Sequence, residues 1–364
     1  MPSTVLFTGF PGFLGRRLVR RIHTRHPDTH WVFLVQEHLR ARAEDDLAQI
    51  AGEQPGFAGR WETVLGDITD PNLGLAAERY AALAARVDTV WHLAAVYDLA
   101  VPEEVARRVN LEGTRHVLDF CQACAGFRRL AYVSTCYVSG DRTGRVLESE
   151  LERGQGFKNH YESTKFAAEV EVQRRWERLP TVIFRPAVVV GDSRTGETDK
   201  YDGPYYFMRL MMKMPRLVPM LGLGAGKGRP NVVPVDFVVA AMAEIADQPD
   251  AAGKVYQLAD PAAITTRELL DAISVALGKP KPPFSVPAAV FDAALSVPAL
   301  RRSLEIPRET VDYANHEVRY DVVNTLDALD GTGIECPPIR EYLPVLIDYL
   351  RRHPDKPFLD RRYL

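Results

Sequence analysis

The sequence predicts an α/β protein with a doubly wound parallel sheet and a smaller, mainly helical C-terminal lobe. Three observations lead to this prediction. The chain opens with an apolar run, Val5 to Phe7, that ends in spaced glycines and leads into a helix-like segment. Strand and helix signals then alternate along the chain, which is typical of a parallel sheet with crossover helices. The strands are apolar on both faces, as expected where helices cover both sides of a sheet.

The opening glycines have the spacing Gly9-x-x-Gly12-x-x-Gly15. Gly9 would let the chain turn out of the strand, Gly12 would let backbone amides approach a pyrophosphate, and Gly15 would let the helix pack on the sheet. The helix N-terminus would direct free N–H groups and a positive dipole end to the phosphates. A glycine-rich turn without a ligand can look the same, so the spacing alone is weak evidence. Its place between a strand and a helix favours a dinucleotide-binding (Rossmann) fold.

The other elements follow in alternation. Further strands are predicted at Trp31–Val35, Thr63–Leu65, Thr89–Leu93, Leu130–Thr135 and Thr181–Arg185. Helices are predicted around Arg16–Arg25, Leu39–Gln49, Tyr80–Arg86, Val105–Cys124 and Tyr161–Arg178. Later in the chain, Val232–Ala246 and Lys254–Leu258 are predicted to return to the sheet.

Composition and charge exclude several classes of protein. The chain has 364 residues, enough for one large domain or two joined ones. A net charge of -3 with dispersed basic residues argues against a nucleic-acid partner. No apolar run approaches the ~18 residues of a membrane span. We expect no signal peptide, because the first strand begins within a few residues of Met1.

The four cysteines do not suggest a disulfide framework in a chain of this length. Cys121 and Cys124 form a CxxC sequence on a predicted helix, without a second pair that would complete a metal site. We interpret them as buried thiols. A reducing, cytoplasmic location follows from this interpretation, and no metal-ligand spacing is present elsewhere.

The character of the sequence changes after Gly191. Residues 192–236 are rich in Gly, Pro, Tyr and Met. We expect a dinucleotide-binding domain at residues 1–191, to which residues 237–260 return. Residues 192–236 and 261–364 would form a substrate-binding lobe over the carboxyl edge of the sheet, where ligands bind in such folds.

Two apolar stretches of this lobe have more than one interpretation. Five of the seven methionines fall between Met208 and Met220. They would either line an adaptable apolar pocket or pack the lobe itself. The stretch Ala288–Leu300 would pack the lobe, with a homodimer face, a pocket wall or a membrane-surface contact as alternatives.

A second chemical signal is Tyr161-Glu162-Ser163-Thr164-Lys165. Tyr161 and Lys165 lie one turn apart on one face of a helix. The lysine ammonium would lower the pKa of the tyrosine, which could then exchange a proton with a carbonyl or alcohol oxygen. Ser134 and Thr135 end the fifth predicted strand, where one hydroxyl could hold the substrate oxygen. Capping of the strand end is the plainer interpretation of these two hydroxyls.

Together these elements resemble the extended short-chain dehydrogenase/reductase family. The matching elements are ordered along most of residues 4–260. They comprise Thr8–Gly15, Gly66-Asp67-Ile68, His92-Leu93-Ala94-Ala95, Asn110, Ser134-Thr135, Tyr161 with Lys165, Arg185–Val189 and Val233-Pro234-Val235-Asp236.

The resemblance implies roles for individual residues. Thr135 would supply the active-site hydroxyl, with Ser134 beside it, Tyr161 the general acid/base, and Lys165 the contact with the cofactor ribose. The implied cofactor contacts are Thr8, Gly9, Pro11, Gly12, Phe13, Leu14 and Gly15 at the pyrophosphate, Asp67 and Ile68 at the adenine, Ala94, Ala95 and Asn110 along the cofactor, and Pro186, Ala187 and Val188 beside the nicotinamide.

Within this family the chain is most similar to the thioester-reductase and fatty-acyl-reductase branch, on Phe13-Leu14-Gly15 and residues 191–198. That resemblance implies reduction of an acyl thioester or aldehyde, with the acyl group supplied on CoA or on a separate carrier. The alternatives are a sugar-nucleotide epimerase or dehydratase, a 3β-hydroxysteroid-type dehydrogenase, and a non-catalytic dinucleotide sensor. The intact set of Thr135, Tyr161 and Lys165 disfavours the last of these.

The end of the second predicted strand bears on the choice of nicotinamide cofactor. An acidic residue there favours NAD(H), whereas positive charge favours the 2′-phosphate of NADP(H). Gln36 stands where acyl-reducing relatives often have arginine, and Glu37 follows it. Arg40, Arg42 and Arg16 could reach a phosphate. We favour NADP(H) by a small margin, with arginines on a solvated helix as the alternative.

Three further features are interpreted conservatively. His160 would be a polar turn residue rather than a proton relay, and His92 would pack near the cofactor. Residues 222–228 are glycine-rich, but the Lys-Ser/Thr ending of a phosphate loop is missing. We interpret this segment as a turn in which Lys227 and Arg229 could meet an anionic tail such as a CoA phosphate.

Overall fold

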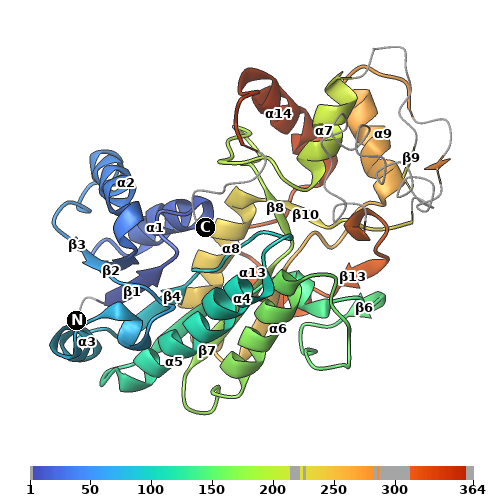
Figure 1. The fold of residues 1–364 in the computed structure, drawn as a ribbon. Coiled ribbons are helices and arrows are strands. Elements are labelled where there is room, and N and C mark those ends of the chain that lie inside the picture. The colour runs from blue at the N-terminus through green and yellow to red at the C-terminus, as the bar shows by residue number, and fades with distance from the viewer. Residues whose placement is uncertain (1–2, 214–221, 224–226, 282–284, 287–311, 358–364) are drawn as a thin grey trace.

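A seven-stranded parallel sheet forms the centre of the molecule (Figure 1). The computed structural model describes residues 3–213, 222–223, 227–281, 285–286 and 312–357. The strand order is β11-β7-β5-β4-β1-β2-β3. These strands are β1 (Thr4–Thr8), β2 (His30–Val35), β3 (Trp61–Leu65), β4 (Thr89–His92), β5 (Arg129–Val133), β7 (Thr181–Pro186) and β11 (Lys254–Leu258). The predicted doubly wound sheet is confirmed.

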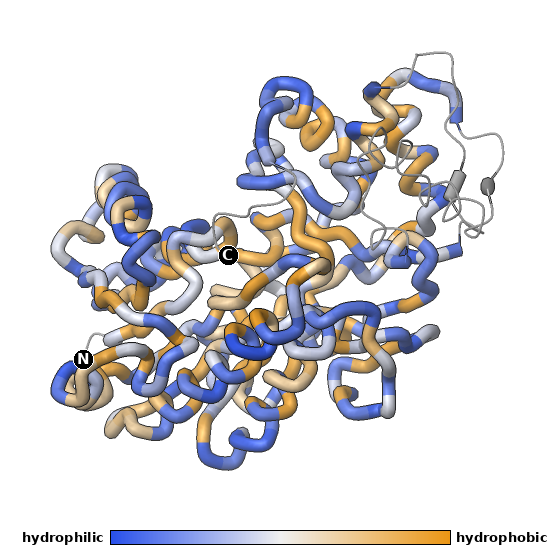
Figure 2. The backbone as a smooth tube through the Cα atoms, in the orientation of Figure 1, coloured by the Kyte–Doolittle hydropathy of each residue, from blue (hydrophilic) through white to orange (hydrophobic). Residues whose placement is uncertain are grey.

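Helices cover both faces of this sheet. One apolar core joins it to α1 (Phe13–Arg25), α2 (Arg40–Glu53) and α8 (Val235–Asp247), and another to α3 (Ala77–Ala84), α5 (Gly113–Ala123) and α6 (His160–Gln173). In α1 the buried Leu18, Val19 and Ile22 share one face at helical spacing. Figure 2 shows α8 as mostly hydrophobic and α2 as more hydrophilic, in agreement with the deeper burial of α8.

The strand order reverses between β1 and β4, which pair directly. In open α/β sheets, ligands bind in the crevice at the carboxyl ends of the two strands where the order reverses. The glycine loop follows β1, and residues 93–96 follow β4. The topology therefore brings two of the predicted cofactor segments to this crevice.

A second group of helices lies beyond the carboxyl edge of the sheet (Figure 1). It contains α7 (Pro204–Lys213), α9 (Thr266–Ala276) and α14 (Ile339–Arg352), which share a separate apolar core. Thr265 and Glu268 form a capping box that fixes the start of α9. The strands β8 (Val188–Val190) and β10 (Val232–Pro234) pair with each other and lead into this group.

The segment Val232–Ala246 returns to the sheet mainly as a helix that packs on it. Only Val232–Pro234 is a strand, it pairs with β8 outside the main sheet, and α8 follows it. The apolar residues of α8 surround the helix because it is buried against both the sheet and α1. A helix that is apolar all round lacks the periodicity that separates it from a buried strand. The prediction for Lys254–Leu258 is confirmed, as β11 pairs with β7.

Two elements from the C-terminal part of the chain pack next to the main sheet rather than in the second group of helices. β6 (Gly144–Val146) pairs in parallel with β13 (Val318–Tyr320), and α13 (Val323–Leu329) packs against α8 and β11. The remaining short elements are α4 (Glu103–Ala106), a π-helical turn Arg107–Glu112, the 3₁₀ turns Glu37–Leu39, Pro71–Gly74 and Cys136–Ser139, and the paired strands β9 (Gly222–Leu223) and β12 (Ser285–Val286).

Several other expectations concern the surface and the cysteines. Within the described residues, no helix is both long and apolar enough to cross a membrane, and no cluster of metal-ligating side chains is found. All four cysteines are free thiols, and burial raises the pKa of Cys124 to about 12. The stretch Ala288–Leu300 lies outside the described residues.

Candidate active site

The glycine loop packs against the chain that leaves β4. Gly9 has a φ of +87°, and a Cβ there would lie 2.7 Å from the backbone N of Ala94. At Gly12 and Gly15 a Cβ would approach the Gly9 carbonyl oxygen to 2.7 Å and 2.9 Å, and at Gly15 it would also press on Phe7 of β1. The predicted helix–sheet packing at Gly15 is therefore confirmed. Gly12 has an additional role, since it lets the loop fold back on itself.

The N-terminus of α1 is suited to an anion. Gly12 is its N-cap and supplies no side-chain hydrogen bond, and the first turn contains no acidic residue. The amides at the start of a helix lack intrahelical acceptors and lie at the positive end of the dipole. Together with the crevice between β1 and β4, this geometry fits the pyrophosphate of a dinucleotide.

Asn110 fixes the segment that follows β4. Its Oδ1 accepts from the backbone N of Val96 at 2.9 Å, and its Nδ2 donates to Val96 O at 3.3 Å and to Thr164 Oγ1 at 3.1 Å. Asn110 is 1% exposed. It was predicted to lie along the cofactor, and the structure shows it tying residues 94–96 to α6.

The floor of the crevice is a chain of buried hydrogen bonds. Thr8 Oγ1 lies 2.7 Å from His92 Nδ1, His92 Nε2 lies 3.1 Å from Thr114 Oγ1, and the Thr114 hydroxyl donates to Asn110 O. Burial lowers the pKa of His92 to about 3, so its ring is neutral. The prediction that His92 packs rather than performs chemistry agrees with this environment.

Gln36 and Asp67 meet at the far end of the crevice. The Gln36 amide donates to Asp67 Oδ2 at 2.6 Å, while Asp67 Oδ1 accepts from the backbone N of Thr69. Ile68 lies against Gly113 of α5, where a Cβ would approach its Cδ1 to 2.8 Å. The residue directly after β2 is thus an uncharged amide that is hydrogen-bonded to the residue predicted at the adenine.

The three arginines considered for a phosphate already have carboxylate partners. Arg16 forms a two-pronged contact with Asp199, at 2.6 Å and 2.7 Å, and Arg42 lies 3.5 Å from the same carboxylate. Arg40 is exposed and pairs with Glu44 one turn later. Asp199 therefore joins the loop after β8 to the first turns of α1 and α2.

Tyr161 and Lys165 occupy the buried face of α6, as their spacing predicted. The Asn159 side chain accepts from Glu162 N and caps the helix. Lys165 is 3% exposed, and its Nζ donates to Val133 O at 2.8 Å and to the Tyr132 hydroxyl at 3.1 Å. Burial lowers the pKa of Lys165 to about 7, although nearby Glu169 opposes this shift.

Tyr161 is brought together with Thr135. The nearby Thr135 hydroxyl favours the phenolate, but burial outweighs this effect and raises the pKa of Tyr161 above its ordinary value. The prediction that Lys165 lowers the pKa of Tyr161 is therefore wrong for this structure. The ammonium lies against the Val133 carbonyl and the Tyr132 hydroxyl, and burial of the phenol dominates.

Ser134 lies apart from this pair. Its hydroxyl donates to Glu169 Oε2 at 2.5 Å, and Glu169 forms a fully buried ion pair with Arg185 at 2.6 Å. A buried carboxylate is retained only when charged partners and hydrogen bonds satisfy it. The two neighbouring hydroxyls therefore face different partners, and Thr135 is the one near Tyr161.

A cavity of about 100 Å³ lies between the sheet edge and the C-terminal lobe. Its walls are mainly apolar and aromatic. They include Tyr97, Tyr137, Val188, Phe207, Leu269 and Tyr313. Tyr97 meets Tyr161 edge to face with 5.0 Å between ring centroids, and Tyr137 packs in the same cluster. The phenol of Tyr161 is thus adjacent to the wall of an apolar cavity.

The structure also bears on residues 187–188, predicted beside the nicotinamide, and on the methionine-rich stretch. Val188 lines this cavity, while Ala187 N donates to Leu258 O beside it. Met208 and Met211 pack in the core of the lobe and do not line the cavity, which supports the packing interpretation for these two. Residues 214–220 of the methionine-rich stretch lie outside the described residues.

A comparison of the sequence with family profiles agrees with this geometry. The profile of the family described as male sterility protein matches residues 7–242. This match spans more than half of the chain. The chain belongs to the male sterility protein family.

Several relatives of this family member carry names of reductases or synthases. A component of the linear gramicidin synthase of Brevibacillus parabrevis is 26% identical over 96% of this chain and 7% of its own length. Aldehyde reductase lnaA of Aspergillus flavus is 30% identical over 71% of this chain and 26% of its own length. The chain thus spans about a quarter or less of these curated relatives.

A solved structure is similar over nearly the whole chain. The terminal R domain from the myxalamid PKS-NRPS biosynthetic pathway matches with a TM-score of 0.81 and 25% identity. The match covers 99% of this chain and 92% of that one. The family assignment and this likeness establish an NAD(P)-binding fold of the extended short-chain dehydrogenase/reductase type.

Sequence reasoning missed several residues that shape the site. Tyr97, Tyr137 and Tyr313 form aromatic walls, and the Glu169–Arg185 pair holds Ser134. Glu169 had a detectable signal, because it lies one turn after Lys165 on the same helix face. The tyrosines had none, since their meeting depends on contacts between distant segments.

Proposed function

We propose that the protein is an NAD(P)-dependent reductase that acts on a carbonyl of an apolar or acyl-type substrate, an acyl thioester or an aldehyde. The observation that carries this proposal is the placement of Tyr161 next to Thr135 and beside the apolar cavity, with Lys165 one turn further along α6. The relatives named as reductases support this proposal. So does the mainly apolar lining, which suits an acyl chain better than a sugar nucleotide.

Each side chain has a distinct part in the proposed mechanism. A nicotinamide cofactor bound in the crevice would supply the hydride that reduces the carbonyl carbon. Thr135 holds the carbonyl oxygen, and Tyr161 donates its phenolic proton to that oxygen as negative charge develops. Because burial raises the pKa of Tyr161, the phenol is protonated at neutral pH and ready to act as an acid. Lys165 would contact the cofactor ribose, and with a pKa of about 7 it is only partly protonated at neutral pH.

The cofactor contacts fit the same scheme. The loop of Thr8, Gly9, Pro11, Gly12, Phe13, Leu14 and Gly15 would hold the pyrophosphate, and Gln36, Asp67 and Ile68 the adenosine end. Ala94, Ala95, Asn110, Pro186, Ala187 and Val188 would line the nicotinamide half. Ser134 would act through Glu169 rather than by touching substrate.

We favour NADP(H) over NAD(H). Gln36 leaves the position after β2 without a carboxylate, and Arg16, Arg40 and Arg42 lie in the first turns of α1 and α2. The 2′-phosphate of NADP(H) would compete with Asp199 for Arg16 and Arg42. Parallel fluorescence titrations with NADH and NADPH test this preference, and tighter NADH binding would contradict it.

The division of labour between the two parts of the chain is also a proposal. Residues 1–191 with 237–260 would bind the dinucleotide, and residues 192–236 with 261–364 would bind the substrate, supplied on CoA or on a separate carrier. The four unpaired thiols support a cytoplasmic location.

The decisive experiment replaces Tyr161 by phenylalanine. Turnover in an NADPH-oxidation screen across acyl-CoAs, long-chain aldehydes and ketosteroids should fall by at least 100-fold, as expected for loss of a general acid. NADPH affinity should be nearly unchanged. Tyr80→Phe, a conservative change at a helix packed against Phe120, serves as the control. Retained turnover in Tyr161→Phe would refute the mechanism.

A further inference from the structure

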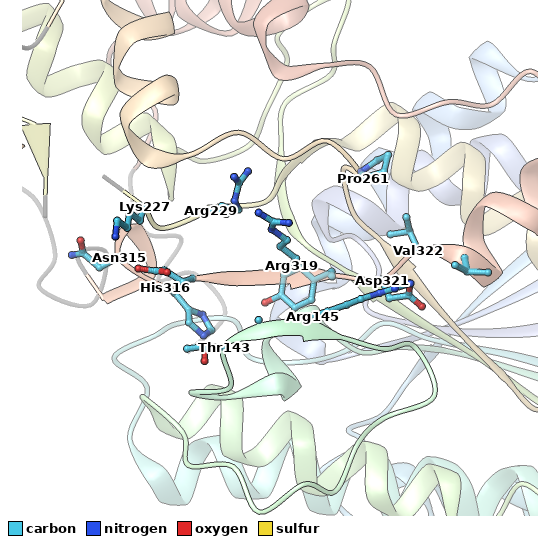
Figure 3. Close-up of a pocket in the computed structure, with 14 residues that line it drawn as sticks. Thr143, Arg145, Lys227, Arg229, Pro261, Asn315, His316, Arg319, Asp321 and Val322 are labelled. Atoms are coloured by element: carbon cyan, nitrogen blue, oxygen red, sulfur yellow. The ribbon is translucent and has the colours of Figure 1, made fainter. Parts of the chain in front are cut away.

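A second and much larger cavity, of about 840 Å³, lies between the β6–β13 pair and the segment 227–229 (Figure 3). Neither Tyr161 nor any predicted cofactor contact lines it. Four cationic side chains do. They are Arg145 of β6, Arg319 of β13, and Lys227 and Arg229 from the facing segment.

The strand register places two of these cations opposite each other. In the parallel β6–β13 ladder Arg319 is the partner of Arg145. Like charges at facing positions of two strands repel and cost stability. Arg145 forms an ion pair with Asp321, whereas Arg319 has no ion-pair or hydrogen-bond partner among the described residues. The pairing leaves Arg319 as an uncompensated charge on the cavity wall.

The facing wall adds further positive charge. Arg229 is fixed, since its guanidinium donates to Ala263 O at 2.8 Å and its backbone N donates to His316 O. Lys227, like Arg319, makes no contact of this kind within the described part of the chain. Figure 3 shows Arg319 extending from β13 toward the segment that carries Arg229. The carboxylates lining the cavity are Glu317 and Asp321, so cations are in excess although the whole chain has a net charge of -3.

This cationic cavity and the apolar cavity beside Tyr161 are lined by consecutive residues of the same two segments. Tyr313 and Ala314 line the apolar cavity, and the next two residues, Asn315 and His316, line the cationic one. In the same way, Arg229 lines the cationic cavity and Pro230 the apolar one. A long ligand with its anionic group in the cationic cavity would therefore have its other end near the apolar cavity.

We propose that the cationic cavity binds the phosphate of the thiol carrier to which the acyl substrate is attached. This assignment rests on the proposed function, because an acyl thioester is the substrate considered. CoA and the phosphopantetheine arm of a carrier protein both have phosphate at a distance from the thioester sulfur. Arginine and lysine are the side chains that bind phosphate through charge-assisted hydrogen bonds.

Calorimetric titration of the full chain with unacylated ligands tests the proposal without requiring turnover. CoA should bind to the unmodified protein, and Arg319→Gln and Lys227→Gln should each weaken it about tenfold, the equivalent of one lost charge-assisted hydrogen bond. Arg128→Gln removes an exposed arginine at the start of β5, the opposite edge of the sheet, and should leave binding unchanged. Equal affinity in all four proteins would overturn the proposal.

The probes also distinguish the two sources of phosphate. If 4′-phosphopantetheine shows the same dependence on Arg319 and Lys227 as CoA, the cavity recognises the phosphate that CoA shares with a carrier protein. If the dependence appears only with CoA, the cavity recognises the phosphates of its nucleotide end. Pantetheine has no phosphate, and binding of pantetheine as tight as that of CoA would contradict both assignments.

Kinetics separate this proposal from the proposed function. The KM for an acyl-CoA should rise about tenfold in Arg319→Gln with kcat unchanged, whereas the KM for the matching N-acetylcysteamine thioester, which has no phosphate, should stay the same. A similar rise with both thioesters would contradict the assignment. The titrations remain decisive even if Tyr161→Phe keeps its activity, so each proposal can fail without the other.

Discussion

At the level of single residues, the burial of Lys165 makes the stability of the fold depend on pH. Its ammonium is buried beside Tyr132, and burial lowers its pKa from 10.5 to about 7. Between these two values the unfolded chain binds more protons than the folded one. The free energy of unfolding should therefore rise with pH from about 7 toward 10, by at most about 1.4 kcal/mol per pH unit from this group.

Replacement of Lys165 by methionine removes this contribution. Urea unfolding of the wild-type protein and of Lys165→Met at pH 7, 8 and 9 should give curves that diverge, with the wild type gaining stability relative to the variant as the pH rises. All other titrating groups are common to both proteins and cancel in the difference. A constant difference across this range would show that burial does not lower the pKa of Lys165 in the folded protein.

Some features of the candidate site could be predicted from the sequence, and others could not. The placement of Tyr161 and Lys165 on one face followed from helix geometry, which is local. The partner of Ser134 could not be predicted in this way, because Glu169 lies on another element and is itself paired with Arg185. The direction of the Tyr161 pKa shift was wrong for a similar reason. It depends on how deeply the phenol is buried, and burial is set by the whole fold.

At the scale of elements, the loop after β8 is tied to α1 and α2 through Asp199. This carboxylate accepts two hydrogen bonds from Arg16 and lies beside Arg42. Asp199→Asn removes the charge that holds these arginines. We expect the Kd for NADPH to fall several-fold, with little change for NADH, because only the 2′-phosphate competes for them. Fluorescence titration measures both values.

Glu197→Gln is the matched control for this loop. Glu197 also pairs with an arginine of α1, Arg17, but at a more exposed position where an ion pair contributes little. The affinities of Glu197→Gln for NADH and NADPH should equal those of the wild-type protein. An equal change of NADH and NADPH affinity in Asp199→Asn would indicate that Asp199 acts on the loop alone and that these arginines do not discriminate the cofactors.

The elements themselves were predictable to different degrees. The strands of the main sheet were found because short apolar runs bounded by turns have few other interpretations. The helix α8 was placed at the sheet but not identified as a helix, because burial on several sides removed its periodicity. The strand β6 was missed altogether. It has three residues, and its partner β13 lies in the C-terminal part of the chain.

At the scale of the whole molecule, Tyr313 connects the C-terminal part to α6, the helix that contains Tyr161. The ring of Tyr313 stacks on Tyr137 with 4.4 Å between centroids. Its hydroxyl donates to Glu162 Oε1 at 2.7 Å and accepts from the Asn159 amide at 2.7 Å. No local pattern in the sequence announces this contact, because it joins three segments that are distant along the chain.

Tyr313→Phe tests whether the substrate lies between the lobe and the sheet. The change keeps the stack but removes both hydrogen bonds and leaves the buried Glu162 with one donor fewer, so the unfolding free energy should fall by about 1–3 kcal/mol. Because Tyr313 lines the apolar cavity and not the cofactor crevice, the KM for the acyl substrate should rise while the Kd for NADPH is unchanged.

Tyr201→Phe provides the comparison for this effect. Tyr201 is a buried tyrosine of the lobe whose hydroxyl donates to His353 O at 2.8 Å, and it does not line the cavity. The Tyr201→Phe variant should have a lower free energy of unfolding and an unchanged KM for the acyl substrate. If both variants change KM equally, the loss reflects general loosening of the lobe. If only Tyr313→Phe does so, the acyl group is bound against the wall that this residue forms, between the two parts of the chain.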